Sequence, residues 1–113
     1  MMRDEVSLTD IRNAARRASS YSEGLTRELF VADERTRAAV VREMEIMGEA
    51  ATRVSQSYRD AHTTIPWSEL IRIRNFYIHV YDAVDYSLVW RTLQRLVPEV
   101  ESAASAILIA DNN

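Results

Sequence analysis

The sequence predicts an all-α protein, an up-and-down bundle of four to five helices in a single domain that spans residues 1–113. Apolar residues recur every three or four positions along most of the chain, which is the period of an amphipathic helix. Only two glycines and two prolines occur, too few for the turns of a β-sandwich or barrel. A chain of 113 residues, 47% of them hydrophobic, is long enough to bury one core without metal or disulfide support.

The first helix is expected over residues 8–22. Ser7 and Asp10 have the spacing of a capping box at its start. Gly24 follows the last apolar position and is a suitable stop, because glycine tolerates the left-handed backbone that often ends a helix.

A short helix or turn over residues 26–30 is expected to place Leu29 and Phe30 in the core. Asp33 can then cap a long amphipathic helix over residues 34–59. Its apolar stripe steps by three and four residues and comprises Val40, Met44, Met47, Ala51, Val54 and Tyr58.

The opposite face of this long helix is charged and is expected to be solvated. It comprises Arg35, Arg37, Arg42, Glu43 and Arg53. Gly48 lies inside the helix, where a glycine costs roughly 1 kcal/mol relative to alanine. Such a glycine indicates a close contact with another helix.

A loop is expected over residues 60–65, and Pro66 suits the first turn of the next helix. That helix runs to Val80 and is apolar around most of its circumference, which predicts a central position in the bundle. Asp85 is expected to cap a last helix, which Pro98 should kink or restart.

Composition excludes several classes of function. Cysteine is absent, so disulfides, thiol catalysis and thiolate metal sites are excluded. No apolar run is long enough to span a membrane, and the first residues do not resemble a signal peptide, so a cytoplasmic protein is expected.

The net charge is −3, which argues against general affinity for nucleic acids. All 14 basic residues are arginine, so only an arginine in a particular place is informative.

Polar side chains interrupt the most apolar of the predicted helices. They are Arg72, Arg74, Asn75, His79, Tyr81 and Asp82. A helix turns about 100° per residue, which places Asn75, His79 and Asp82 on one face. Arg74 and His79 are about 140° apart on an ideal helix. A partner helix, the length of the arginine or a local distortion must therefore bring both to one substrate.

A structural role for these residues is the alternative. His79 could be a hydrogen-bonded histidine of the helix, with Asn75 or Asp82 as its partner. An interior arginine is often paired with an acid on a neighbouring helix, here Glu45 or Glu49.

The spacing Arg74-Asn75-x-x-x-His79-x-Tyr81 resembles the signature of the HepT-like branch of the HEPN superfamily. That signature is an arginine followed by four to six residues and then a histidine, with a polar residue directly after the arginine, and its extension is a tyrosine two residues after the histidine. The stretch 45–51, Glu-Ile-Met-Gly-Glu-Ala-Ala, is similar to the family's Ile-Gly-Glu-Ala segment. The resemblance covers nearly the whole chain and includes Pro66, Trp67, Asp85 and Trp90.

The resemblance implies a HEPN-like bundle that acts as the toxin of a type VII-like toxin–antitoxin system. Such a toxin is a homodimeric, metal-independent endoribonuclease without a cofactor. It cuts tRNA or mRNA and is neutralised by a minimal nucleotidyltransferase antitoxin. By the resemblance, Arg74 and His79 are catalytic, Asn75 supports them, and Tyr81 is the residue on which the antitoxin places AMP.

Further side chains are candidates to support this site. They are Arg72, Asp82, Glu45 and Glu49. The alternative function is a non-catalytic helical scaffold that binds a nucleotidyltransferase, an interpretation that the negative net charge favours slightly.

Four other features are expected to have structural roles. His62 lies in a polar loop and is expected to be solvated, and the arginines of the first helix are expected to form a solvated face. Those arginines are Arg12, Arg16 and Arg17. The tryptophans Trp67 and Trp90 are expected in the core or at an interface, and Met44 and Met47 in the core.

Replacement of Tyr81 by phenylalanine is expected to leave the toxin active and to make it resistant to AMP transfer, because the acceptor hydroxyl is absent from phenylalanine. Mass spectrometry after incubation with the nucleotidyltransferase and ATP measures the added AMP. Normal modification of the Tyr81→Phe variant would identify another acceptor.

Overall fold

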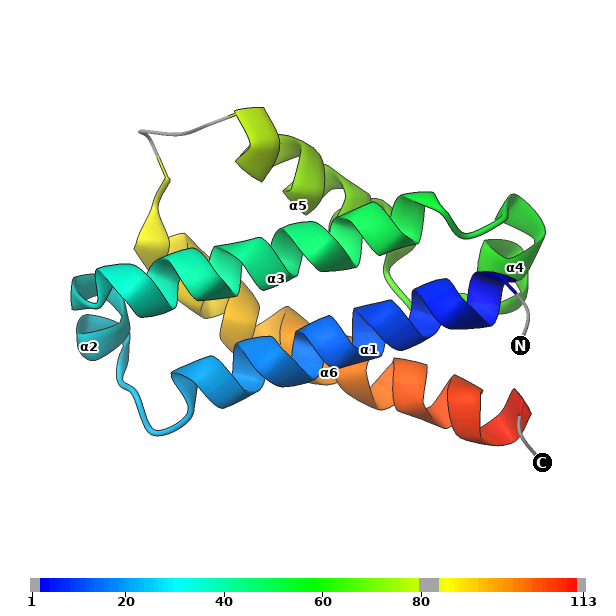
Figure 1. Cartoon of the computed structure of the whole chain (residues 1–113), viewed down its shortest axis with the longest axis horizontal. Helices are drawn as coiled ribbons and strands as arrows, with labels where there is room; N and C mark the ends of the chain where they lie inside the picture. Colours follow the sequence, from blue (N-terminus) through cyan, green and yellow to red (C-terminus); the bar gives the residue numbers. More distant parts are fainter. Residues whose placement is uncertain (1–2, 80–83, 112–113) are drawn as a thin grey trace.

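The computed structural model describes residues 3–79 and 84–111, and these form six helices (Figure 1). They are α1 (Arg3–Ser22), α2 (Arg27–Ala32), α3 (Glu34–Thr52), α4 (Gln56–Ala61), α5 (Trp67–His79) and α6 (Tyr86–Asp111). No strand occurs in the described part of the chain, so the predicted all-α fold is confirmed. Four of the helices are long, and α2 and α4 are single short segments.

The long helices run up and down beside one another (Figure 1). α3 lies between α1 and α5, and α6 packs along α1 and also contacts α2. α2 and α4 lie at opposite ends of the bundle. The core comes from one apolar face of each long helix, and its largest fully buried side chains are Phe30, Leu8, Ile11, Met44, Met47, Ile65, Leu70 and Leu96.

α1 begins five residues earlier than the sequence predicted. The predicted capping box is wrong, because Ser7 lies inside the helix and is only 4% exposed. The start of α1 is instead tied to the start of α4. The carboxylate of Asp4 accepts hydrogen bonds from the backbone nitrogen and the hydroxyl of Ser55, at 2.9 and 2.7 Å. Those bonds lower the pKa of Asp4. At the other end Gly24 has a φ of 80°, as a glycine stop requires.

The short segment before α3 carries one buried aromatic residue. Thr26 caps α2, and Phe30 is completely buried. The prediction that Leu29 is buried is wrong, since Leu29 is 55% exposed. Adjacent residues on a helix point about 100° apart, and the short α2 buries Phe30 while Leu29 points away from the core. Asp33 caps α3 as predicted, because its carboxylate accepts from the backbone nitrogen of Thr36 at 3.1 Å.

The predicted helix over residues 34–59 is divided in two. α3 ends at Thr52, and Ser55 caps α4. The side chain of Arg59 donates to the carbonyl oxygens of Ala51 and Val54, at 3.0 and 3.1 Å. A side chain thereby satisfies carbonyls that a continuing helix would have used, which the apolar spacing does not reveal.

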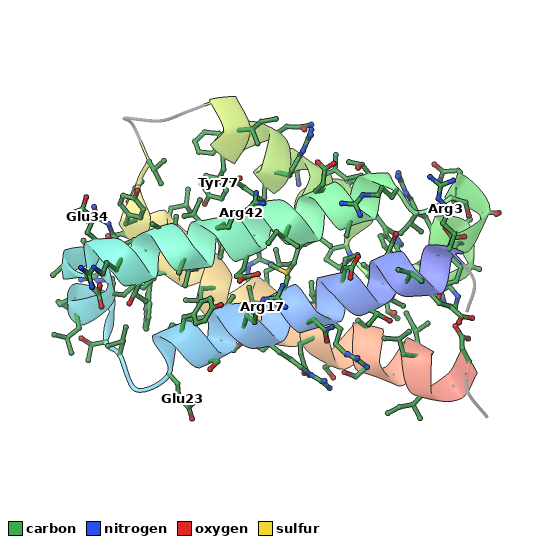
Figure 2. The ribbon with its side chains drawn as sticks, in the orientation of Figure 1. Arg3, Arg17, Glu23, Glu34, Arg42 and Tyr77 are labelled. Carbon is green, nitrogen blue, oxygen red and sulfur yellow. The ribbon has the colours of Figure 1, made fainter. Side chains whose placement is uncertain are left out.

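Glu43 departs from the predicted solvated face of α3, since it is only 6% exposed. Its carboxylate accepts from the guanidinium of Arg17 with both oxygens at 3.0 Å and from the hydroxyl of Tyr21 at 3.3 Å. Figure 2 shows Arg17 on the side of α1 that lies next to α3. A buried carboxylate needs such partners, so Glu43 joins α1 to α3.

α5 lies at the side of the bundle, and the prediction of a central position is wrong. Its main contact is with α3, while Arg72, Asn75 and Phe76 are exposed. Leu70 and Tyr77 are buried on the inner face. The polar residues within α5 leave only part of its circumference available for burial, so α3 becomes the central helix.

α6 begins where the sequence predicted. Asp85 accepts hydrogen bonds from the backbone nitrogens of Ser87 and Leu88, at 3.0 and 3.3 Å. The helix then continues through Pro98 without ending or restarting. Trp90 on α6 packs against Phe30 with ring centroids 5.3 Å apart, which fixes α2 over α6. No helix in residues 3–79 and 84–111 is long and apolar enough to cross a membrane.

The predicted close contact at Gly48 is present between α3 and α5. A Cβ atom added to Gly48 would overlap the Cβ of Arg74 and lie 2.5 Å from the carbonyl oxygen of Leu70. The second of these atoms belongs to the backbone of α5 and cannot move alone. The short distance between α3 and α5 therefore depends on position 48 being a glycine, which has no side chain.

Replacement of Gly48 by alanine is expected to lower the free energy of unfolding by about 1–3 kcal/mol, because α5 must move away from α3. Helix propensity alone predicts the opposite sign, a gain of about 1 kcal/mol. Urea unfolding followed by circular dichroism measures the difference. Ala38→Ser, at an exposed position of α3, is the control, and a more stable Gly48→Ala variant would contradict the close contact.

Candidate functional site

The candidate site lies where α5 passes over α3 at Gly48. Arg74 stands directly above that glycine, so its side chain leaves α5 at the edge of the helix contact. Glu49 follows Gly48 on α3, and its carboxylate meets the guanidinium there. The same close contact between α3 and α5 thus requires a glycine at position 48 and sets the position of Arg74.

Two hydrogen bonds and an ion-pair contact hold the Arg74 guanidinium. Its Nε and Nη2 atoms lie 3.0 and 2.8 Å from the same carboxylate oxygen of Glu49, Oε2. Its Nη1 atom donates to the side-chain oxygen of Asn75 at 2.9 Å. A guanidinium carries five N–H donors, so three remain beyond these two hydrogen bonds within the described residues. The Arg74 side chain is 30% exposed, so part of it is accessible to a ligand.

The other predicted residues of the motif lie on the last turn of α5 or beyond it. Asn75 is exposed and is bonded to Arg74, whereas the sequence left open a role as partner of His79. His79 is the last residue of α5, one turn after Asn75. Tyr81 and Asp82 lie outside the described residues. α5 is helical from Trp67 to His79, and the side chain of His79 lies outside the described part of the chain.

The predicted supporting residues divide into two groups. Glu49 contacts Arg74, as described above. Glu45 instead lies 3.6 Å from Arg42, three residues earlier on α3. Arg72 is exposed, and within residues 3–79 and 84–111 no ion pair joins it to Glu45 or Glu49.

A cavity of about 270 Å³ opens beside Arg74, between α3 and α5. We call it the α3–α5 groove, and it is lined by Arg42, Glu45, Ile46, Glu49, Arg53, Arg74 and Ile78. Figure 2 shows Arg42 at the side of α3 that faces α5. The sequence predicted only a solvated face for Arg42 and Arg53. The sequence does place Arg42, Glu49 and Arg53 on one helical face. That spacing could not predict the groove, because charged residues on any solvated helical face have it.

Tyr77, the buried aromatic residue of α5, is neutral at physiological pH. Burial raises its pKa to about 12, and the neighbouring Tyr86 and Asp85 contribute to that rise. Tyr77 is therefore unsuited to act as a base and serves to pack α5 against the bundle. Within the described ranges, no group of three histidine, aspartate or glutamate residues is arranged to hold a metal ion.

One expectation about residues elsewhere is corrected. His62 is half-buried rather than solvated, because its ring packs on Tyr58 with centroids 4.3 Å apart. Arg16 and Arg17 are exposed, as expected of a solvated face, and each also pairs with a carboxylate: Arg16 lies 2.9 Å from Glu101, and Arg17 donates to Glu43. These pairs leave α1 with little basic character.

The predictions for the tryptophans and methionines hold. Trp67 is 7% exposed and its indole nitrogen donates to the carbonyl oxygen of His62 at 2.9 Å. Trp90 packs on Phe30. Met44 and Met47 are each only 1% exposed, in the core.

Comparison with known proteins adds a second line of observation. A family model described as Ribonuclease HepT-like matches residues 11–107, which include α2 to α5 and most of α1 and α6. No solved structure matches the chain significantly.

Curated relatives cover most of the chain. A protein named Probable ribonuclease HepT, from Thermococcus cleftensis, is 33% identical over 83% of this chain and 86% of its own length. A candidate RNase of Caldanaerobacter subterraneus subsp. tengcongensis is 36% identical over 75% of this chain and 76% of its own. A candidate RNase of Methanocaldococcus jannaschii is 29% identical over 88% of this chain and 92% of its own.

Replacement of Glu49 by glutamine is expected to change the free energy of unfolding by less than about 1 kcal/mol, because the Glu49 side chain is 45% exposed and its ion pair is partly solvated. Glu43→Gln is the matched variant, since Glu43 also pairs with an arginine but its side chain is only 8% exposed. That second replacement should cost about 1–3 kcal/mol. Thermal unfolding of both variants tests the order, and an equal or larger destabilisation by Glu49→Gln would show that Arg74 is held chiefly for stability.

Proposed function

This chain belongs to the HepT-like ribonuclease family, and from that membership we propose that it is an endoribonuclease whose catalytic residues are Arg74 and His79. The observation that supports this assignment best is the position of Arg74. Its guanidinium is oriented by Glu49 and Asn75 at the rim of a groove, and His79 follows five residues later in the chain. A residue that served only to join two helices would not need accessible donors.

The proposed reaction uses the RNA's own 2′-hydroxyl as the nucleophile. A base takes the proton of that hydroxyl, the oxygen attacks the adjacent phosphorus, and the 5′-oxygen leaves with a proton from an acid. The products are a 2′,3′-cyclic phosphate and a free 5′-hydroxyl. Histidine titrates near neutral pH and can act as the base or as the acid, which is the role we assign to His79.

Arg74 is proposed to stabilise the negative charge that develops on the phosphate oxygens. A guanidinium stays charged at all relevant pH values and presents paired donors that match two phosphate oxygens. Glu49 and Asn75 fix its plane before the substrate arrives, so little reorganisation is needed during the reaction. Glu49 also offsets part of the positive charge, which keeps the unliganded guanidinium stable at this half-buried position.

A homodimer is proposed because a regular helix does not direct two residues five positions apart to one phosphate. Arg74 and His79 are about 140° apart around a regular α5. A two-fold axis near the end of α5 would bring the arginine of one protomer towards the histidine of its partner. It would also supply two histidines, one as base and one as acid.

Regulation is proposed to act through Tyr81, two residues after His79 in the sequence. A nucleotidyltransferase antitoxin would attach AMP to its hydroxyl. The added phosphate carries negative charge and bulk close to the place where an RNA phosphate binds, so modification would prevent substrate binding.

Replacement of His79 by alanine is expected to abolish RNA cleavage, by at least about 100-fold, because alanine has no group that transfers a proton. Gel electrophoresis of labelled tRNA and mRNA incubated with purified protein measures cleavage. His62→Ala is the matched control, since His62 lies before the opposite end of α5 and packs on Tyr58.

The cleavage assay distinguishes the ribonuclease function from the scaffold function. Cleavage by the His62→Ala variant but not by His79→Ala supports the proposed enzyme. Undiminished cleavage by a folded His79→Ala variant contradicts it. Absence of cleavage by the unmodified protein, together with stable binding to a nucleotidyltransferase, would favour the scaffold function.

A further inference from the structure

The α3–α5 groove contains more positive charge than the proposed chemistry uses. Three of its lining residues are arginines, and only Arg74 belongs to the motif. Arg42 lies on α3, Arg53 caps its C-terminal end, and neither has a role in the reaction described above. Two glutamates, Glu45 and Glu49, also line the groove, so its charged lining sums to +1, whereas the protein as a whole has a net charge of −3.

The three arginines are distributed along the groove rather than gathered at one point. Glu49 and Arg53 follow Arg42 by seven and eleven residues and therefore share one face of α3 with it. The helix rises about 1.5 Å per residue, so Arg42 and Arg53 are attached about 16 Å apart. Arg74 approaches from α5 between them, at the level of Glu49. This separation is greater than one phosphate-to-phosphate step along an RNA strand.

Arg42 and Arg53, the two outer arginines of the groove, make few contacts with other side chains. Arg42 is 3.6 Å from Glu45, and its side chain is 69% exposed, so this contact is a solvated one. Arg53 caps the end of α3 through its backbone and is exposed. No ion pair to Arg53 occurs within residues 3–79 and 84–111.

We propose that Arg42 and Arg53 bind the phosphates that flank the phosphate at Arg74, so that the α3–α5 groove holds the backbone of a single-stranded RNA. This inference rests on the proposed ribonuclease function and extends it to the binding of the substrate. Guanidinium groups are suited to phosphate oxygens and fix the register of a nucleic acid without reading its bases.

The size and lining of the groove favour a single strand. Its volume of about 270 Å³ lies below the usual range for small-molecule pockets, so it is too small for a duplex. Ile46 and Ile78 are half-buried and offer aliphatic surface to the sugars between the charged contacts. Contacts of this kind predict little dependence on base sequence.

The alternative basic surface is less suitable. On α1, Arg16 and Arg17 are both engaged with carboxylates, at 2.9 and 3.0 Å. A phosphate there would have to displace Glu101 or Glu43, and Glu43 is buried between two helices. Within the described part of the chain, the arginines of the groove are therefore better placed to bind a strand that passes Arg74.

Binding is tested separately from cleavage with a fluorescent 2′-O-methyl oligoribonucleotide, in which the attacking hydroxyl is blocked. Arg42→Gln and Arg53→Gln are each expected to weaken binding by about 3- to 10-fold at low salt, equally for uridine and adenine sequences. The slope of log affinity against log salt should become shallower by about 0.7 for each phosphate that the variant no longer binds. Arg91→Gln is the matched control, since Arg91 is an exposed arginine of α6 that does not line the groove.

The possible results are distinct for the two proposals. Unchanged binding by folded Arg42→Gln and Arg53→Gln variants, or equally weakened binding by Arg91→Gln, overturns the groove assignment, and cleavage by the parent protein then still supports the ribonuclease. RNA binding that Arg42→Gln and Arg53→Gln weaken, without cleavage of unmodified RNA by the parent protein, supports RNA binding in the groove and contradicts the ribonuclease function. If polyglutamate binds and requires Arg42 and Arg53, while RNA does not bind, the groove binds an acidic protein and the assignment to RNA is overturned.

Discussion

The close approach of α5 to α3 at Gly48 is the constraint on which the candidate site depends. The backbone carbonyl of Leu70 and the side chain of Arg74 occupy the space that any other residue at position 48 would fill. With α5 at this distance, Glu49 reaches the guanidinium of Arg74 directly. A wider separation would leave the arginine in solvent, where a single ion pair contributes little and fixes no orientation.

Arginine serves three different purposes in this chain, and its surroundings decide which. Arg59 donates to backbone carbonyls and allows α3 to end. Arg17 neutralises the buried Glu43 and joins α1 to α3. Arg74 is held by polar partners but retains accessible donors, which is the arrangement expected of a group that binds an anion. Composition alone cannot separate these purposes, since all basic residues of the chain are arginine.

Local signals in the sequence predicted much of the fold correctly. Asp33 and Asp85 cap helices, and Gly24 ends one, because capping needs only a few neighbouring residues. The errors concern burial, the start of α1 and the end of α3. Leu29 is exposed and Glu43 is buried, since each outcome depends on which neighbouring helix covers that position. For the candidate site, the sequence indicated that an acid of the long helix would meet an arginine of the motif, but not which pair would form.

The sequence by itself determined the helical fold, most of the helix ends, the glycine that permits a close contact and the family to which the chain belongs. These features are encoded by spacing, by capping residues and by a motif, all of which are local along the chain. Only the tertiary structure decided that α3 rather than α5 is central, that Glu49 rather than Glu45 holds Arg74, and that Arg42 and Arg53 line the same groove. Each of these depends on the distance and rotation between two helices, and packing sets both through contacts between residues far apart in the sequence.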